Sequence, residues 1–289
     1  MKVDFFIVGS PKAGTTSLYY YLNEHPEIEM STQKEADFFS DSAIQKQGLY
    51  YGKNRIDTLE KYHNLFPTIV QEKKYGEASV SYLFYEDVPE KIKAYNSKGK
   101  IIIMLRNPAD RAFSHYLMDY RLGLIKSTFE EVIERTSYNK ESRLFYQQYI
   151  ELGLYFKQVK RYLDIFDSEN IHIIFYKDLK KDIEIVMKEV YHFLEVDSNF
   201  KPKVEKKHNT FIIPKNNFIK IVYSFVGLRR LLKFFITENL VKKMQNTFFK
   251  KDKKPELSLK LRKKINELFL HDINLLEGLL SKDLSIWKK

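Results

Sequence analysis

The stretch FFIVGSPKAGTTSLYYYLNEHP, residues 5–26, decides the fold class of this protein. Residues 5–8 predict a short buried strand, the loop GSPKAGTT follows, and residues 15–23 predict a helix that ends before Pro26. Strand, loop and helix in this order are the setting of a phosphate-binding loop. The stretch departs from the Walker pattern G-x-x-x-x-G-K-[ST], because Thr15 stands at the lysine position and the nearest lysine, Lys12, lies inside the loop.

Apolar strand patterns and helix patterns alternate beyond this stretch. Further buried strands are predicted at 28–30, 100–105 (KIIIML) and 171–175 (IHIIF), with a strand end or turn at 76–79. Helices are predicted at 88–95, from Asn107-Pro108 onward, and at 129–136, 153–166, 179–194 and 257–280, whereas residues 41–75 read as irregular. This alternation predicts an α/β fold, a three-layer sandwich with a central, mostly parallel sheet.

The composition narrows the class of protein. The 289 residues suit one large α/β domain or two small ones, and 44% hydrophobic with 30% charged residues indicates a globular chain. The chain has no cysteine, which excludes disulfides, thiolate nucleophiles and cysteine-based zinc sites. No apolar run approaches roughly 18 residues and no long apolar segment opens the chain, so we expect a cytoplasmic protein without a transmembrane helix.

The net charge of +11 points to anionic partners. A nucleic acid, an anionic membrane, a polyanionic glycan and a highly charged nucleotide all fit this charge. A lysine-rich solvated surface is the alternative explanation.

The loop at residues 9–16 is suited to hold an anion. The backbone N–H groups at the start of the predicted helix, with the hydroxyls of the threonines and the charge of Lys12, form such a site. A magnesium-dependent NTPase would have a lysine after the second glycine and an acidic residue at the end of a buried strand. The strand at 100–105 instead ends in Arg106, so NTP hydrolysis is a weak fit.

Several segments resemble the sulfotransferases that use 3′-phosphoadenosine 5′-phosphosulfate (PAPS). SPKAGTTSLYYYLNEHP (10–26) resembles their 5′-phosphosulfate loop, and RNPADRAFSHY (106–116) resembles their 3′-phosphate motif. KEADFF (34–39) resembles the KE-x-H-FF segment of the heparan-type Golgi enzymes and their bacterial relatives. GEASVSYLF, GLYFKQVKRYL and the closing PELSLKLRKKINELF also resemble the bacterial branch, so the likeness covers nearly the whole chain.

The resemblance implies a PAPS site that requires no metal and releases adenosine 3′,5′-bisphosphate (PAP). The residues implied to bind the donor are Lys12, Ala13, Gly14, Thr15, Thr16, Ser17, Arg106, Ser114 and Lys215. Arg106 suits the 3′-phosphate because a guanidinium binds phosphate oxygens in a fork, and Ser114 adds a hydroxyl. Lys215 lies in HNTFIIPKNN, which departs from the Lys-Gly pair of the heparan-type enzymes, and an ordinary basic loop is the alternative there.

The same resemblance implies a carboxylate base. Glu35 matches the catalytic glutamate of the family, but the family's histidine two residues later is Asp37 here, so two carboxylates are candidates. Lys12 and Lys34 complete the implied catalytic set, and Lys34, Asp37 and Tyr82 are expected on the acceptor side. For Tyr82, core packing and substrate contact both remain open.

We therefore predict one sulfotransferase domain over residues 1–289 that moves a sulfuryl group from PAPS to a hydroxyl or amine of a carbohydrate acceptor. Residues 199–256 are expected to close over nucleotide and acceptor, and residues 257–289 to form a C-terminal helix. A small-molecule or nucleoside kinase with a phosphate-binding loop, and a non-enzymatic basic protein that binds glycans or nucleic acid, are the alternative functions.

Residues 221–235 (IVYSFVGLRRLLKFF) mix bulky apolar and basic side chains. We predict a helix that packs over the active site. The alternative is peripheral contact with the anionic inner face of a membrane, which would suit an anionic or lipid-linked glycan. Nucleic acid is not a predicted partner.

Overall fold

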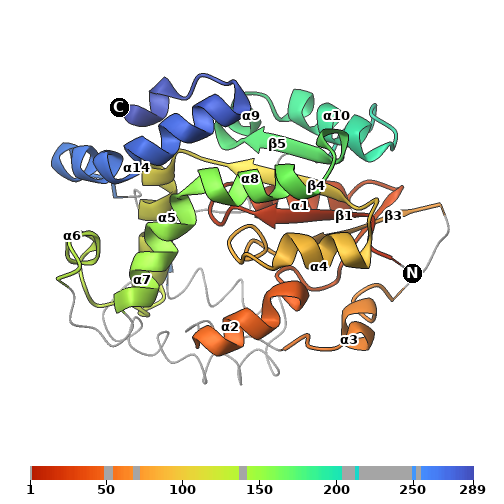
Figure 1. Cartoon of the computed structure of the whole chain (residues 1–289), viewed down its shortest axis with the longest axis horizontal. Helices are drawn as coiled ribbons and strands as arrows, with labels where there is room; N and C mark the ends of the chain where they lie inside the picture. The colour runs from red at the N-terminus through yellow and green to blue at the C-terminus, as the bar shows by residue number, and fades with distance from the viewer. Residues whose placement is uncertain are drawn as a thin grey trace.

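A computed structural model describes residues 2–48, 55–67, 72–136, 142–203, 212–214, 249–251 and 255–289. The described part is built on a five-stranded, all-parallel sheet in the order β2-β3-β1-β4-β5, with helices on both faces (Figure 1). Its strands are β1 (Phe5–Gly9), β2 (Ile28–Met30), β3 (Lys74–Ala78), β4 (Lys100–Leu105) and β5 (Ile171–Phe175). The predicted α/β fold, with a central parallel sheet between helical layers, is confirmed.

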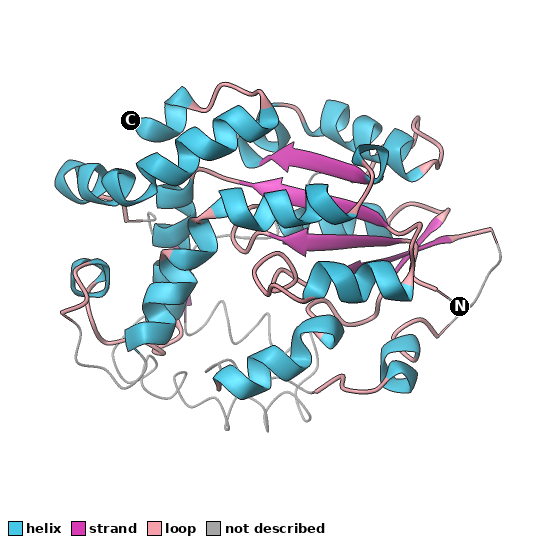
Figure 2. Ribbon diagram, viewed as in Figure 1, coloured by secondary structure: helices cyan, strands magenta, loops and turns pink. Residues whose placement is uncertain are grey.

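The helices divide between two hydrophobic cores, one on each face of the sheet (Figure 2). Successive strand residues point to opposite faces, so Phe6 and Val8 enter one core while Phe5 and Ile7 enter the other. The first core is lined by α4 (Val88–Tyr95), α5 (Pro108–Arg121), α8 (Tyr155–Ile165) and α14 (Leu259–Leu280), and the second by α1 (Thr15–Asn23) and α10 (Ile183–Leu194). Because both faces are covered, β1 and most of β4 are continuous apolar runs, whereas β3 also buries the carboxyl group of Glu77.

The structure corrects several predicted boundaries. The region predicted as irregular contains α2 (Asp41–Gln47), α3 (Leu59–His63) and the start of β3. The helix predicted at 179–194 is two helices, α9 (Tyr176–Lys181) and α10, because Asp182 has an extended backbone and its side chain accepts a hydrogen bond from the Ile185 N–H at 3.1 Å. The helix predicted at 129–136 ends earlier, as α6 (Phe129–Ile133), and α7 (Ser142–Tyr149) was not predicted.

The start of α5 is fixed by its own sequence. The Asn107 side chain accepts hydrogen bonds from the backbone N–H groups of Ala109 at 3.0 Å and Asp110 at 3.2 Å, and Pro108 occupies the first turn. The helix therefore begins directly after β4. Arg106 is left at the junction between strand and helix.

The remaining described elements complete the chain. They are the turns η1 (Phe38–Ser40), η2 (Glu151–Gly153), η3 (Ser168–Asn170) and η4 (Ser285–Lys288), and the antiparallel pair β6 (Ile212–Pro214) and β7 (Phe249–Lys251). Lys215, the segment 221–235 and most of the region 199–256 lie outside the described residues, so the predictions made for them remain predictions. Within the described ranges, none of the helices has the length and apolar character needed to cross a bilayer.

Candidate active site

Three segments that carry predicted donor and acceptor residues meet at one edge of the sheet. β3, β1 and β4 are neighbours and run parallel, so their carboxyl ends lie side by side. The loop 10–14 follows β1, Arg106 follows β4, and the backbone N–H of Glu35 donates to the carbonyl oxygen of Ala78, the last residue of β3, at 2.8 Å. Ligands of open α/β sheets bind at this edge.

The loop after β1 is held tightly against its neighbours. Ser10 donates to the carbonyl oxygen of Met104 through its backbone N–H at 2.7 Å and its hydroxyl at 3.0 Å. A Cβ on Gly9 would lie 2.7 Å from the Cβ of Leu83, so only glycine fits there. Gly14 has φ 98°, a left-handed conformation that L-residues rarely adopt, and it precedes the first residue of α1.

The start of α1 presents the backbone donors that the sequence predicts. The first N–H groups of an α-helix have no partner within the helix, and they point out of its N-terminus. The side chain of Thr15 is buried, with 3% exposed, whereas Thr16 and Ser17 are partly exposed. Ala13 is 0% exposed. The backbone N–H of Ala13 donates to the carbonyl oxygen of Ser10 at 3.3 Å, and that of Ser17 to the carbonyl oxygen of Gly14 at 2.9 Å. The backbone N–H groups of Thr15 and Thr16 and the hydroxyls of Thr16 and Ser17 are therefore the groups best placed for an anion.

Lys12 lies between the loop and α5. Its Nζ is 3.5 Å from the Sδ of Met118, and its φ of 67° is left-handed. The charge of Lys12 also acts on buried His115, one turn before Met118 on the same helix. The ammonium group is thus close to the helix that carries the predicted 3′-phosphate motif.

Arg106 is bound to the loop and packed on an aromatic ring. Its Nη1 donates to the carbonyl oxygen of Lys12 at 3.0 Å, and its Cζ lies 4.8 Å from the centre of the Tyr176 ring. The Tyr155 hydroxyl donates to the carbonyl oxygen of Arg106 at 3.0 Å. Sequence reasoning missed Tyr176. Its position directly after β5, the neighbour of β4, was the available signal.

α5 carries a partly exposed serine, a buried arginine and a buried histidine. Ser114 is partly exposed, as a ligand contact requires. Arg111 is 0% exposed and its Nη1 donates to the carbonyl oxygen of Gln148 at 3.0 Å, so it has a structural role. Burial lowers the pKa of His115 well below its usual range, and the positive charges of Arg111 and Lys12 lower this pKa further. His115 is therefore neutral near pH 7.

Glu35 and Lys34 form an ion pair on the acceptor side. The Lys34 ammonium donates to Oε1 of Glu35, while Oε2 of Glu35 accepts from the backbone N–H of Val80 at 3.2 Å. The side chain of Lys34 keeps 17% of its surface exposed, and that of Glu35 keeps 23%. A carboxylate and an ammonium group are thus within reach of a ligand at this edge.

Asp37 is more enclosed than Glu35. Its residue exposure is 6%, and its Oδ1 accepts from the hydroxyl of Ser81 at 2.6 Å. Its backbone N–H donates to the hydroxyl of Ser79 at 2.8 Å. Both Glu35 and Asp37 lie near the end of β3, but Glu35 is the more accessible carboxylate.

Tyr82 lies in the core rather than at the surface of the site. It is 0% exposed, its hydroxyl accepts from the backbone N–H of Phe39 at 3.3 Å, and the two rings are 5.6 Å apart. The expectation that its ring contacts the acceptor does not fit this burial. Of the two roles left open for Tyr82, the structure shows core packing.

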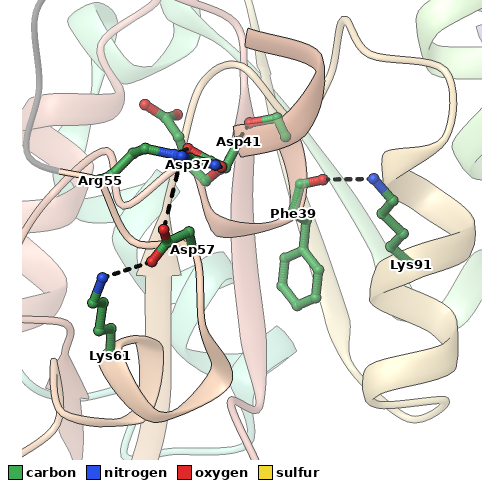
Figure 3. A network of polar contacts seen from close by, with 8 residues as sticks. Asp37, Phe39, Asp41, Arg55, Asp57, Lys61 and Lys91 are labelled. Carbon is green, nitrogen blue, oxygen red and sulfur yellow. Dashed lines mark hydrogen bonds and ion pairs between the residues drawn. The ribbon is translucent and has the colours of Figure 1, made fainter. Parts of the chain in front are cut away.

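The segment that follows Glu35 and Asp37 in the chain is held in place by ion pairs of Arg55 and by a hydrogen bond from α4 (Figure 3). Arg55 binds Asp41 at 2.7 Å and lies 3.9 Å from Asp57. From the other side, the Lys91 ammonium donates to the carbonyl oxygen of Phe39 at 3.2 Å. Arg55 is about half exposed, so its pairs contribute little stability and mainly set the position of η1 and α2.

The cationic groups found at this site are two side chains and the amides of a helix N-terminus. Among the residues that the structure describes, no group of three or more His, Asp or Glu side chains is arranged to hold a metal ion. Lys12, Arg106 and the α1 amides are the groups that fit a phosphosulfate and a phosphate.

Comparisons with known proteins agree with the motifs. The family model described as sulfotransferase domain matches residues 2–273. The solved structure of a sulfotransferase from Alicyclobacillus acidocaldarius is 30% identical, covers 100% of both chains and has a TM-score of 0.73. The bifunctional heparan sulfate N-deacetylase/N-sulfotransferase 1 of Xenopus laevis is 30% identical over 196 residues, which cover 66% of this chain and 22% of that protein.

A membrane-associated sulfotransferase, kil1, of Dictyostelium discoideum is 23% identical over 300 residues, which cover 75% of this chain and 61% of that protein. The chain spans about a fifth of the length of the heparan sulfate N-deacetylase/N-sulfotransferases that it matches. With the fold, the motifs and the family match in agreement, the chain belongs to the sulfotransferase family and is a PAPS-dependent sulfotransferase domain.

Proposed function

We propose that this domain transfers the sulfuryl group of PAPS to a hydroxyl, or an amine, of a carbohydrate acceptor, with Glu35 as the general base. The observation that carries the proposal is the meeting of three groups at one sheet edge. The phosphosulfate loop follows β1, Arg106 follows β4, and Glu35 is hydrogen-bonded to the end of β3, which lies on the other side of β1. A donor bound by the first two groups has its transferable sulfur near the third.

On the donor side, positive charges and backbone amides bind the two anionic ends of PAPS. Lys12 and the first amides of α1 stabilise the negative charge that develops on the leaving phosphate as its bond to sulfur breaks. Arg106 binds the 3′-phosphate, and Ser114 supplies a hydroxyl to it. Lys215, from outside the described residues, is proposed as a further contact to the same phosphate.

On the acceptor side, Glu35 accepts the proton of the acceptor hydroxyl while the acceptor oxygen forms its bond to sulfur. Lys34 is paired with this carboxylate, which keeps it oriented and places a cation beside the acceptor. Asp37 is the second candidate base, but its burial and its hydrogen bond from Ser81 favour a role in orienting the segment.

A cluster of amide and hydroxyl groups near Asp37 supports a carbohydrate acceptor. The Tyr85 hydroxyl donates to Oε1 of Gln47 at 2.7 Å, and Nε2 of Gln147 donates to the same oxygen at 3.2 Å. Burial raises the pKa of Tyr85 to about 12, and the charge of Asp37 contributes to the shift, so the two side chains are close. Amides, hydroxyls and an aromatic ring are the groups that bind sugar hydroxyls in protein pockets.

The decisive experiment is to incubate the protein with labelled PAPS and a panel of glycans that differ in charge, amine content and lipid linkage. Transfer of label to a glycan, lost in Glu35→Gln, supports the proposal. Tyr85→Phe and Gln47→Leu, at the partly exposed members of this cluster, should raise KM for that glycan while the affinity for PAP stays within about twofold, because a lost hydrogen bond costs about 1 kcal/mol only for the ligand it contacts. Transfer to small phenols but to no glycan would contradict the carbohydrate assignment.

The alternatives fit the site less well. A kinase needs the lysine that Thr15 replaces, and Arg106 stands where its acidic metal ligand would be. A non-enzymatic glycan- or nucleic-acid-binding protein does not need an anion loop and an arginine on separate strands. Salt-sensitive binding without any label transfer would favour it. Membrane contact through residues 221–235 and a cytoplasmic location remain predictions, the first tested by co-sedimentation with anionic liposomes.

A further inference from the structure

A buried carboxyl group lies directly beneath the acceptor side of the site. Glu77 is on β3 and 0% exposed. Its Oε1 accepts a hydrogen bond from the Ser79 hydroxyl, and the Ser79 oxygen accepts one from the backbone N–H of Asp37 at 2.8 Å. Glu77 is thus connected, through one serine, to the backbone of the segment that carries Glu35.

This segment adopts a backbone conformation that its own residues disfavour. Glu35 has φ 63° and Asp37 has φ 55°, both left-handed and costly for residues other than glycine. Such a conformation persists only where surrounding contacts hold it. Here the contacts come from the end of β3: the Glu35 N–H donates to the carbonyl oxygen of Ala78 at 2.8 Å, and the Asp37 N–H donates to Ser79.

The groups that face Glu77 are acidic or neutral. Asp37 and Glu35 lie on the segment above it, and each favours the protonated form of Glu77. The tyrosines whose charged forms interact with it come from several elements: Tyr19 of α1, Tyr62 of α3, Tyr82 after β3 and Tyr162 of α8. Ionised Glu77 would add another negative charge, without water, beneath Glu35 and Asp37.

Two further observations agree with a proton on Glu77. Its Oε2 is buried and has no hydrogen-bond partner among the described residues, a state that costs more for a charged carboxylate oxygen than for a neutral carboxyl group. Burial raises the pKa of Glu77 to about 8, because the hydrogen bonds from Ser79 and Tyr82, which lower this pKa, offset the effect of burial only in part and the charges of Asp37 and Glu35 raise it further.

We propose that Glu77 is a positioning residue that must stay protonated to hold Ser79 and, through it, the segment that carries Glu35 and Asp37. The neutral carboxyl accepts the Ser79 hydrogen bond without repelling the two carboxylates above it. This inference rests on the proposed role of Glu35 as the base. The position of Glu35 then depends on Glu77 staying neutral.

The test compares two variants of the whole chain. Glu77→Gln keeps a neutral side chain and an oxygen that accepts from Ser79, whereas Glu77→Leu keeps similar volume without an acceptor. Hydrogen exchange of the peptide spanning residues 31–40 reads the position of the segment and requires no acceptor glycan. We expect wild-type exchange in Glu77→Gln and about fivefold or faster exchange in Glu77→Leu, since the loss of one hydrogen bond is worth about 1 kcal/mol.

Donor binding and turnover separate positioning from general damage. PAP affinity should stay within about twofold in both variants, because the donor loop and Arg106 have other supports. Sulfuryl transfer should persist in Glu77→Gln and fall in Glu77→Leu. Wild-type exchange and turnover in Glu77→Leu would overturn the proposal, as would loss of turnover in Glu77→Gln with unchanged exchange, because a charged Glu77 would then be required.

The proton itself is tested by melting temperature against pH. The folded protein keeps a proton that the unfolded chain releases above pH 4.5, so wild-type stability should fall relative to Glu77→Gln as pH rises from 4.5 to about 8. A difference in melting temperature that does not change over this range would overturn the protonated state. Neither the melting temperature nor the hydrogen exchange depends on turnover, so both measurements can be interpreted even if the acceptor is not a carbohydrate. Near-normal turnover in Glu35→Gln would refute the base role alone.

Discussion

The guanidinium of Arg106 donates a hydrogen bond to the carbonyl oxygen of Lys12 at 3.0 Å. The residue predicted to bind the 3′-phosphate is therefore attached to the loop predicted to bind the phosphosulfate. The Tyr176 ring lies against Arg106 and also fits close to Gly14, where an added Cβ would be 3.0 Å from the ring. We therefore expect the two ends of the donor to contact one connected group of residues rather than two independent sites.

PAP should stabilise the folded protein more than ATP does. A ligand that binds only the folded state adds RT ln(1 + [L]/Kd), about 2.7 kcal/mol at a hundred times Kd. We expect a clear rise in melting temperature with PAP, a much smaller one with ATP and Mg²⁺, and no effect of EDTA on the PAP result. Equal stabilisation by ATP and PAP would contradict the donor assignment.

Arg106→Ala should weaken PAP much more than adenosine 5′-phosphosulfate, which lacks the 3′-phosphate. A charge-assisted hydrogen bond is worth about 1.5–3 kcal/mol, so PAP affinity should fall about 10- to 150-fold in titration calorimetry. Arg143→Ala, which removes an exposed arginine from α7, is the matched control and should change neither affinity. An equal loss for both ligands would show instead that the bond to Lys12 supports the whole loop.

Glu35→Gln should slow sulfuryl transfer about 10²- to 10⁴-fold, the usual contribution of a positioned general base, without weakening PAP. Glutamine keeps the size of the side chain and can still accept from the Val80 N–H, so the backbone should stay in place. Asp37→Asn is made in parallel. If it is inactive while Glu35→Gln turns over normally, the base is Asp37, and if both turn over normally, transfer does not use a carboxylate base.

His115 should make the folded protein sensitive to acid. Its pKa is held well below the usual value by burial and by the charges of Arg111 and Lys12, so below about pH 6.5 the unfolded chain binds a proton that the folded chain does not. Its contribution to stability is therefore present above pH 6.5 and is lost as pH falls. The slope reaches at most about 1.4 kcal/mol per pH unit for one group.

Urea unfolding at several pH values between 7.5 and 5 measures this slope. His115→Asn should reduce the loss of stability on acidification, since its amide can still donate to the carbonyl oxygen of Gln148 but cannot gain a proton. His271→Asn, on the exposed side of α14, is the control and should keep the wild-type slope. Equal slopes in wild type and His115→Asn would show that His115 is not held neutral in the folded state.

The sequence by itself determined the elements that form the predicted donor half of the site. The strand at 5–8, the loop and the helix at 15–23 are contiguous, and their signals are local: an apolar run, two glycines and a helix stop. The same holds for Arg106, which stands between a buried strand and the Asn107-Pro108 start of α5. Local backbone conformation and helix capping depend on residues that are adjacent in the sequence. Strands β1, β4 and β5 and helices α1 and α4 therefore lie where the patterns predict them.

The tertiary structure decided the acceptor half. Glu35 is hydrogen-bonded to Ala78 because β3 enters the sheet between β2 and β1, a neighbour relation that no local pattern specifies. The same placement buries Tyr82 and Glu77, and the chain crossing that brings Tyr176 beside Arg106 is equally non-local. Burial and long-range contacts, rather than residue type, set whether a tyrosine packs in the core and whether a carboxyl group keeps its proton.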